Sequence, residues 1–543
     1  MRHYLTQACR MAALALLICA CAGAAFAQET TGTINGTVKD ATGAVVKGAT
    51  VTITDESKQQ VVRTVTTGDD GEYSVPSLPV GLYTVTVEAP NFKKSAQTGV
   101  KLDVNQRRTV DVALEAGNIS EVVTVEAAPV AVELTTPTVS TVINGDQARE
   151  LSVNNRNFIQ LVTLAPGVSA NLADQVYVGT TNPTGQANTV NISVNGSRSS
   201  QNTFTVDGAD ITDRGSNITI QAYPSLDSIS EFKVLRSLYP AESGSSGGGQ
   251  VTLITRSGGD RFHGDLFEFV RNQKLNANDF ITNETTGNPP CGRESNGKAR
   301  RCPFRYNDFG GTIGGPVYFP RFGEGGGTAF ARKLSRTFFF FSEEARRDVR
   351  YPTLVSTVPD ANLRQGIFPV PVCLTYNSAG TACTEVLPAG TALPANRFNP
   401  AATAYLNEVY NKLPLPNAPN FTLNSAFRAQ ANFHQEILRL DHTMSDKWTM
   451  FYRYERDTIP TIDVNSLFSS GSGLPGVATT QTDSPGRTHT FQSDYTITPN
   501  MIAEGRFTYA YGAILSHNIG LLALANSPNP VTLPFTNTRD RIT

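Results

Sequence analysis

The sequence contains few of the residues on which most enzyme active sites depend. Only six histidines and one tryptophan occur in 543 residues, and none of the histidines begins the HxxE or HExxH arrangement of a zinc peptidase. The glycine cluster at 244–249 lacks the lysine and the following Ser or Thr of a phosphate-binding loop. We therefore predict no catalytic residues, no metal ligands and no cofactor, and we expect that the protein is not an enzyme.

Neither charge of one sign nor long apolar segments dominate the sequence. The 45 basic and 47 acidic side chains nearly balance, which argues against a nucleic-acid partner. The apolar run from Met11 to Ala27 is too short to span a membrane, follows basic residues and ends in Ala25-Phe26-Ala27. It predicts a secretory signal peptide over residues 1–27, with cleavage after Ala27, and hence export. Lipidation of Cys21 is the alternative.

Cysteine is scarce once the signal peptide is removed. Three of the seven cysteines leave with that peptide, and the other four form two close pairs, Cys291 with Cys302 and Cys373 with Cys383. Both pairs lie in sequence rich in Pro, Gly and Asn, which is typical of loops. In an oxidising compartment such pairs predict two local disulfides. Zinc binding is the alternative, but neither pair is CxxC and no histidine lies nearby.

Residues 30–117 have the pattern of a small β-sandwich. Runs such as TINGTVKD, ATVTITD and LYTVTVEA alternate apolar and polar residues and are separated by glycine-containing turn signals. The spacing G-x-V-x-D, G-A-x-V-x-I, D-x-G-x-Y and L-P-x-G-x-Y-x-V resembles the carboxypeptidase regulatory-like domain, a prealbumin-like sandwich. The matching positions are Gly36, Val38, Asp40, Gly48, Ala49, Val51, Ile53, Asp69, Gly71, Tyr73, Leu78, Pro79, Gly81, Tyr83 and Val85. This resemblance implies a fold but no activity.

From residue 143 the sequence changes to a mixed α and β pattern. Gly145 or Asp146 is predicted to cap a short helix that ends before Pro166, and two strand–turn units follow at 190–198 and 203–208. The motifs NRNFxxLxxLxPGV, VNGSRxxxNxFxVDGxD and SISEFKVLxSxYxAExGxxxGGQVxxxTRSG are similar to the plug domain of TonB-dependent outer-membrane receptors, over residues 143–257.

The plug resemblance marks a set of motif residues in its two turns. They are Asn195, Gly196, Arg198, Asp207 and Gly208. Asp207 is also the first of three closely spaced aspartates, with Asp210 and Asp213. Their spacing does not match a calcium loop, so we predict a turn that orders the plug instead of a metal site.

The segment at 118–142 joins the sandwich to the plug. It contains the β-prone run Glu121-Val122-Val123-Thr124-Val125-Glu126-Ala127, for which no partner strand is evident nearby. Such a run is suited to addition at the sheet edge of another protein. The run resembles the TonB box, and the resemblance implies TonB as a partner. A last strand of the sandwich and a simple linker are the alternatives.

Residues 258–543 are predicted to form the N-terminal part of an outer-membrane β-barrel. In the run 447–456, Trp448, Met450, Tyr452 and Tyr454 fall on one face and Thr449, Arg453 and Glu455 on the other, as in a wall between lipid and a wet lumen. The motifs FHGDLFEFVRNxxLNAxDF, FRYNDFGGTIGGPV and RTFFFFSEEARR resemble the first barrel strands of the Oar-like branch of the same family. The runs become longer and more aromatic after Arg261, and the glycine cluster 244–249 before them is predicted to be the hinge, a plain flexible connection.

The aromatic pattern gives about seven candidate barrel strands. They are centred on Leu266, Ile313, Phe339, Leu438, Tyr452, Phe491 and Phe507. A plugged barrel of the resembled family has about 22 strands, so we expect a C-terminally truncated chain that cannot transport by itself. The polar inserts at 282–305 and 355–431 are expected to be external loops.

The predicted fold class is mainly β: a prealbumin-like sandwich, an α+β plug and the first strands of a transmembrane barrel. The resemblance implies a TonB-dependent outer-membrane transporter or receptor that takes up a substrate by energised plug opening. The sandwich is then expected in the periplasm, and outer-membrane lipid around the barrel. No motif encodes the imported substrate, for which a glycan and a peptide are the candidates. An exported carbohydrate-binding or adhesion protein that uses the sandwich is the alternative function.

Overall fold

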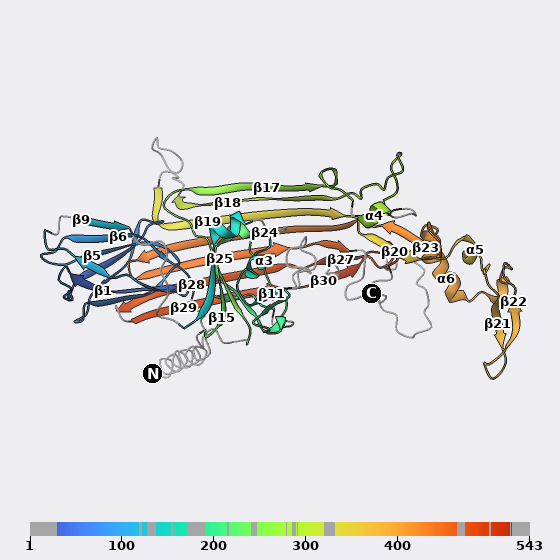
Figure 1. The fold of residues 1–543 in the computed structure, drawn as a ribbon, viewed down its shortest axis with the longest axis horizontal. Coiled ribbons are helices and arrows are strands. Elements are labelled where there is room, and N and C mark those ends of the chain that lie inside the picture. Colours follow the sequence, from blue (N-terminus) through green and yellow to red (C-terminus); the bar gives the residue numbers. More distant parts are fainter. Residues whose placement is uncertain are drawn as a thin grey trace, which may run out of the picture.

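The computed structural model contains three successive units (Figure 1). The first is a β-sandwich, the second is an α+β unit that we call the plug, and the third is a long antiparallel sheet that we call the barrel wall. The described residues are 30–118, 122–126, 137–151, 153, 156–170, 190–213, 215, 217–239, 247–278, 280–284, 289, 291–319, 332–463, 473–498, 501–521 and 523. The predicted signal peptide and its cleavage site lie outside them. Within these ranges no helix has the length and apolarity needed to cross a membrane.

The sandwich consists of two sheets that enclose an apolar core. One sheet has the order β4-β1-β7, with β8 also paired to β1, and the other has the order β3-β2-β5-β6-β9. The first eight strands are β1 (Gly32–Asp40), β2 (Thr50–Asp55), β3 (Gln60–Thr66), β4 (Glu72–Leu78), β5 (Gly81–Glu88), β6 (Lys94–Leu102), β7 (Arg107–Thr109) and β8 (Val112–Leu114). Alternate residues point inward as the pattern predicts, and in β5 these are Tyr83, Val85 and Val87.

One glycine of the sandwich matches a close crossing of the backbone. β1 passes directly against the chain that links β7 to β8, so that a Cβ atom at Gly36 would lie 1.9 Å from the carbonyl oxygen of Val110. Only glycine fits there without a backbone shift. The Tyr73 hydroxyl donates a hydrogen bond of 2.6 Å to the same carbonyl oxygen. This crossing therefore explains why the sandwich motif requires glycine at that position.

The strand β9 (Val122–Glu126) extends the sandwich by one edge strand. It pairs in parallel with β6, from Lys94 opposite Val122 to Thr98 opposite Glu126. The expectation that this run has no nearby partner strand is therefore wrong. The partner was missed because the sequence pattern does not reveal β6 as a strand. Four of the five β9 side chains are exposed, and only that of Val123 is half-buried. The strand is held mainly through its backbone.

The plug is a five-stranded sheet with two short helices packed on it. The strand order is β10-β15-β16-β13-β14, and β11 pairs with β12 in a separate hairpin. Its elements are β10 (Val139–Asn144), α2 (Gly145–Glu150), α3 (Phe158–Val162), β11 (Val168–Ala170), β12 (Ile192–Val194), η1 (Ser199–Gln201), β13 (Thr203–Val206), β14 (Ala209–Asp210), η2 (Leu226–Ser228), β15 (Ile229–Ser237) and β16 (Gln250–Thr255). The core includes Phe158, Tyr223 and Phe232, whose rings pack against one another.

Two details of the plug differ from the sequence-based expectation. Asn144 caps α2 through a capping box with Gln147, so neither Gly145 nor Asp146 is the cap; an Asn side chain accepts from the N3 amide more readily than glycine can. The described part of the glycine cluster is also not the flexible hinge that the sequence suggested. Gly248 and Gly249 are buried, and an added Cβ on either would contact plug residues at 2.5–2.6 Å. β16 follows them, so the transition lies at 256–262.

Within the part of the chain that the structure describes, the barrel wall has seven long strands, in the order predicted. Their path is β17-β18-β19-β24-β25-β28-β29, all antiparallel. They are β17 (His263–Asn272), β18 (Arg305–Phe319), β19 (Arg332–Arg350), β24 (Ala429–Ser445), β25 (Trp448–Thr458), β28 (Gly486–Thr498) and β29 (Met501–Gly512). The short strands β26 (Thr461–Asp463), β27 (Thr480–Asp483) and β30 (Leu515–Asn518) pair beside them. On β25, Arg453 and Glu455 are fully buried toward the plug, as the alternation predicts.

The polar inserts between wall strands are partly folded. They contain η4 (Gln273–Leu275), α4 (Phe280–Glu284), β20 (Thr353–Thr357), α5 (Ala361–Arg364), β21 (Val372–Tyr376), β22 (Cys383–Leu387), η5 (Ala395–Arg397), α6 (Pro400–Glu408), η6 (Tyr410–Lys412) and β23 (Thr422–Ala426). A small core that includes Val358, Val409 and Leu423 supports the larger insert. In Figure 1 this insert lies at the end of the barrel wall opposite to the sandwich.

Candidate functional site between the plug and the barrel wall

Asp207 and Gly208 form a tight turn that joins β13 to β14. Their φ angles are 47° and 73°, and two successive positive values are what a type I′ hairpin turn requires. The Asp207 carboxylate accepts hydrogen bonds from the Thr255 amide at 3.0 Å and from the Thr255 hydroxyl at 2.7 Å. Asp207 is only 2 % exposed. The turn therefore brings a buried carboxylate to the end of β16, where the chain leaves the plug.

The same carboxylate contacts two arginines of the barrel wall. Arg439 Nη1, on β24, donates to Asp207 Oδ1 at 3.2 Å, and Arg453 Nη1, on β25, lies 3.5 Å from Asp207 Oδ2. Both guanidinium groups are buried. Arg439 also donates two hydrogen bonds of 3.1 Å to Asp441, and Arg453 lies 3.5 Å from Glu455. Each wall arginine thus has one carboxylate on its own strand and shares the carboxylate of the plug.

A second charged contact lies around Arg156 of the plug. Its guanidinium is paired with Asp227 within the plug, and its Nε atom is 3.9 Å from Glu344 Oε1 on β19. The centre of the guanidinium lies 4.1 Å from the ring centroid of Phe267 on β17, which is a cation–π geometry. Ser225 donates a hydrogen bond of 2.7 Å to Glu344 Oε2. Burial raises the pKa of the Asp227 carboxyl, although Arg156 opposes that shift.

The wall side of the second contact is itself a buried ionic cluster. Arg346 lies 2.7 Å from Asp308 and 3.3 Å from Glu344, and all three side chains are at most 2 % exposed. A third contact uses the plug backbone, because the Tyr223 amide donates to Asp457 at 2.9 Å. Removing one partner from a buried charged pair costs about 3–5 kcal/mol. The plug is therefore held against the barrel wall by buried charged contacts.

Comparison with known families assigns each unit. The family described as "Outer membrane beta barrel domain" matches residues 254–538, the carboxypeptidase regulatory-like domain matches residues 33–115, and the TonB-dependent receptor plug domain matches residues 133–251. The chain belongs to the TonB-dependent outer-membrane receptors. Its mainly β fold class is the one predicted, and its barrel strands assign it to the outer membrane. This family consists of transporters, not enzymes.

Several known proteins resemble this receptor over part of its length. The TonB-dependent transporter Oar of Myxococcus xanthus is 28 % identical over 310 residues, which are 54 % of this chain and 26 % of that protein. The outer-membrane transporter YddB of Escherichia coli is 9 % identical with a TM-score of 0.44, covering 70 % of this chain and 40 % of that one. A mutant ferric enterobactin receptor of Pseudomonas aeruginosa is 13 % identical with a TM-score of 0.38, covering 72 % and 43 %. The receptor chain thus spans about a quarter of the curated relative.

The other plug-motif residues of the receptor lie in a different turn. Asn195 and Gly196 have φ angles of 52° and 78°, directly after β12, and both are exposed. Asn195 donates to the Arg236 carbonyl at 3.0 Å and so fixes this turn against β15. Arg198 is exposed and precedes η1, where its amide donates to Gln201 at 3.2 Å. Of the five motif residues, it is the Asp207–Gly208 turn that contacts the barrel wall, through Arg439 and Arg453.

The TonB-box candidate of the receptor is only partly described. Glu121 and Ala127 lie outside the described residues, and Val122–Glu126 form β9. Within the described ranges the second edge of β9 carries no strand. The prediction that this run binds TonB is not tested by these contacts. They do place it at a sheet edge, where backbone amide and carbonyl groups can pair with another chain.

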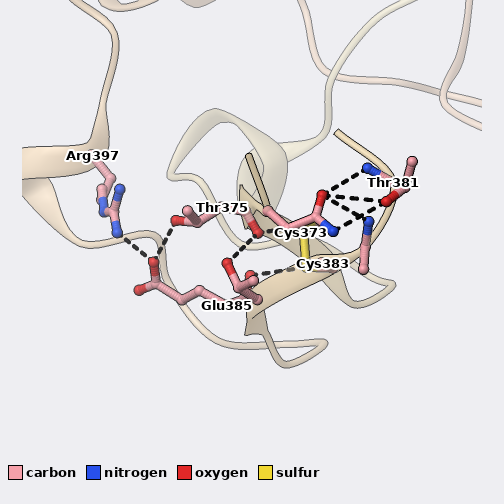
Figure 2. Close-up of a disulfide and its surroundings, with 9 residues drawn as sticks. Cys373, Thr375, Thr381, Cys383, Glu385 and Arg397 are labelled. Atoms are coloured by element: carbon pink, nitrogen blue, oxygen red, sulfur yellow. Dashed lines mark hydrogen bonds and ion pairs between the residues drawn. A yellow bond between two sulfur atoms is a disulfide. The ribbon is translucent and has the colours of Figure 1, made fainter. Parts of the chain in front are cut away.

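The four cysteines that lie within the described residues of the receptor are paired in the structure. Cys291 is bonded to Cys302 and Cys373 to Cys383, with Cα atoms 5.3 Å and 5.8 Å apart. The second bond links the strands of the β21–β22 hairpin (Figure 2). Next to it, Glu385 accepts a hydrogen bond of 2.8 Å from Thr375 and forms an ion pair with Arg397. Both bonds belong to inserts between wall strands.

The wall partners of the plug were only partly visible in the sequence. The inward positions of Arg453 and Glu455 follow from strand alternation, but nothing in the sequence connects them to Asp207. Arg156 and Asp227 were not predicted at all. Arg156 lies within the NRNF motif, and its positive φ of 53°, which is uncommon for an arginine, is a feature that only coordinates reveal. The alternative function, a stalk that carries a binding sandwich, does not account for the barrel match over 254–538.

Proposed function

We propose that this receptor takes up a substrate across the outer membrane when TonB, energised from the inner membrane, pulls the plug away from the barrel wall. The observation that carries the proposal is the ionic contact of Asp207 with Arg439 and Arg453. A plug with a purely apolar interface would be released only by exposing apolar surface. Buried charged pairs instead gain hydration when they separate, which offsets part of the cost of opening. The contact at Arg156 and Glu344 supports the same mechanism.

TonB binds, in this proposal, by adding a strand at residues 121–127. β9 supports this, because it is an edge strand with a short, exposed and valine-rich sequence. Main-chain hydrogen bonds supply most of the affinity in strand addition. The corresponding division of the chain is a signal peptide at 1–27, a periplasmic sandwich at 30–117, a linker at 118–142, a plug at 143–257 and barrel strands at 258–543. The barrel contacts outer-membrane lipid through the outward row that includes Tyr452 and Tyr454.

The substrate in this proposal is a glycan or a peptide that enters past the folded inserts. The larger insert has its own core, and its β21–β22 hairpin is closed by a disulfide. A rigid entrance of this kind suits recognition of a defined solute better than an unstructured loop does. Growth of a deletion strain on a panel of glycans, peptides and chelated metals identifies the solute. Loss of growth on one of them, restored by the gene, defines the substrate for the next test.

Proline substitution at Val123 tests the coupling step. Proline lacks the amide donor that strand addition uses, so Val123→Pro is expected to abolish growth on the identified solute and its energy-dependent uptake. Binding of the solute to the cell surface should remain. Val123→Thr is the matched control, because it keeps the amide and the β-branched shape. Full uptake by Val123→Pro would show that the run serves only as the edge strand of the sandwich.

A further inference from the structure

The turn between β6 and β7 of the sandwich is held by hydrogen bonds with two side chains of the plug. Glu231 and Lys233 lie on the same face of β15 and are 2 % and 3 % exposed. The Glu231 carboxylate accepts a hydrogen bond from the Val104 amide, and Lys233 Nζ donates to the carbonyls of Val104 and Asn105, each at 3.0 Å. Val104 is fully buried at this contact. The turn is rigid because Asn105, with a φ of 49°, donates its amide to the Thr31 carbonyl at 3.0 Å.

The turn between β2 and β3 contacts the barrel wall. Lys58 Nζ lies 3.5 Å from Asp441 Oδ1, with side chains 15 % and 11 % exposed. The Ser57 carbonyl accepts a hydrogen bond of 2.9 Å from the Asp260 amide, in the connection from plug to barrel. Two further polar contacts lie farther along the wall, from Arg63 to Thr496 and from Arg506 to Thr30. The sandwich is therefore fixed to both other units.

A small cavity lies where the three units meet. Its volume is about 290 Å³, and it is lined by Lys58 of the sandwich, Asp207 of the plug, and Arg439 and Thr449 of the wall, among others. Asp441, which points into the lumen, is covered by Lys58 here. The charged groups that fasten the plug to β24 thus lie directly beneath the sandwich. In Figure 1 the sandwich lies against this end of the wall strands.

We propose that the sandwich is a lid over the periplasmic mouth of the lumen, held closed by the Glu231 and Lys233 clamp of the plug. This inference rests on the proposed function in one respect, namely that TonB opens the lid. Because β9 belongs to the sheet that contains β6, a pull on β9 acts on the sandwich before it acts on the plug. The solute then leaves through a mouth that opens only when the sandwich undocks.

The first experiment measures whether the mouth is covered. Thr449→Cys places a thiol in the cavity, and the four native cysteines within the described residues are paired. Outer-membrane fragments containing the intact receptor are treated with a membrane-impermeant maleimide, and modification of residue 449 is read by peptide mass spectrometry. Adding Glu231→Ala and Lys233→Ala is expected to raise the labelling rate at least tenfold. Lys94→Ala is the control and should leave the labelling rate unchanged, because Lys94 lies on β6 of the sandwich and is paired with Glu88 of the same unit. Equal labelling with and without the clamp would overturn the lid.

The second experiment locks the lid. A Cβ atom at Gly259 lies 4.0 Å from the Cβ atom of Ser57, within the range of a disulfide. In cells, TonB-dependent labelling of Thr449→Cys is expected to disappear in the oxidised Ser57→Cys, Gly259→Cys receptor and to persist in the Ser57→Cys single variant. Labelling that continues in the locked receptor would refute the lid. If no variant shows TonB dependence while the clamp result of the first experiment holds, the lid stands and the proposed function fails.

Discussion

Replacing Asp207 by asparagine should loosen the plug without disturbing its turn. Asparagine tolerates the positive φ of 47° at this position and keeps an oxygen that can accept from the Thr255 amide. The change therefore removes mainly the negative charge between Arg439 and Arg453. Losing one partner of a buried pair costs about 3–5 kcal/mol. Each arginine keeps a second carboxylate, so we expect the lower value, about 3 kcal/mol, which raises the equilibrium constant for plug opening roughly 100-fold.

Hydrogen exchange measures this effect directly. Amides of β13 and β16 in the receptor in outer-membrane fragments should exchange roughly 100-fold faster in the Asp207→Asn variant, whereas sandwich amides should be unaffected. Asp210→Asn is the matched control, because the Asp210 carboxylate accepts from the Thr212 amide within the plug, at 2.9 Å. The reasoning fails if exchange in β13 and β16 changes by less than threefold, or if Asp210→Asn has an equal effect.

Three further predictions concern other parts of the receptor. Non-reducing peptide mapping should recover both cysteine pairs as linked peptides, each bond contributing about 3 kcal/mol at most, and four free thiols would contradict this. Gly36→Ala should destabilise the sandwich by about 3 kcal/mol because the added Cβ clashes with Val110, and calorimetry should show a lower Tm. Gly81→Ala should not lower the Tm, because the nearest neighbour of its Cβ lies at 3.9 Å. Burial raises the pKa of Glu231 to about 8; the nearby Asp103 adds to this shift and Lys101 opposes it. Lys233 lies on the same face of the strand. The docked state binds the Glu231 proton more tightly than the undocked one, so docking should weaken as pH rises from about 4.5 to 8. The assay is the labelling rate of Thr449→Cys relative to an exposed reference cysteine. A Glu231→Gln variant with the same pH profile would disprove this prediction.

Local patterns in the sequence predict the strands well but not their partners. The alternation from Trp448 to Arg456 assigns each side chain to the lipid or the lumen face, because a strand has a fixed period of two. The same alternation cannot predict that Asp207 meets Arg453, since that contact depends on how two separately folded units dock. The capping error at Asn144 is of another kind. Two adjacent residues could each begin the helix, and only the backbone geometry selects the true cap.

The parallel pairing of β9 with β6 could not be predicted from the sequence either. The run alternates poorly and has exposed valines, so its own pattern does not indicate which sheet it joins. Its partner β6 is similarly irregular, with only Ser95, Val100 and Leu102 buried. Two weak strands of this kind recognise each other through backbone hydrogen bonds, which carry no sequence signature. The glycine cluster misled for the opposite reason, because Gly248 and Gly249 are required by close packing and not by flexibility.

The edge position of β9 has a consequence for the apparent affinity of TonB. A partner that must first displace β9 from β6 binds only the fraction of receptors in which β9 is free, so a strand docked 99 % of the time weakens the apparent Kd about 100-fold. A partner that pairs with the second edge of β9 meets no such reduction. Within the described residues no strand pairs with that edge, so in the proposed mode of binding TonB need not displace β9 from β6. Under the proposed function, occupancy by TonB therefore follows the TonB concentration without that 100-fold reduction.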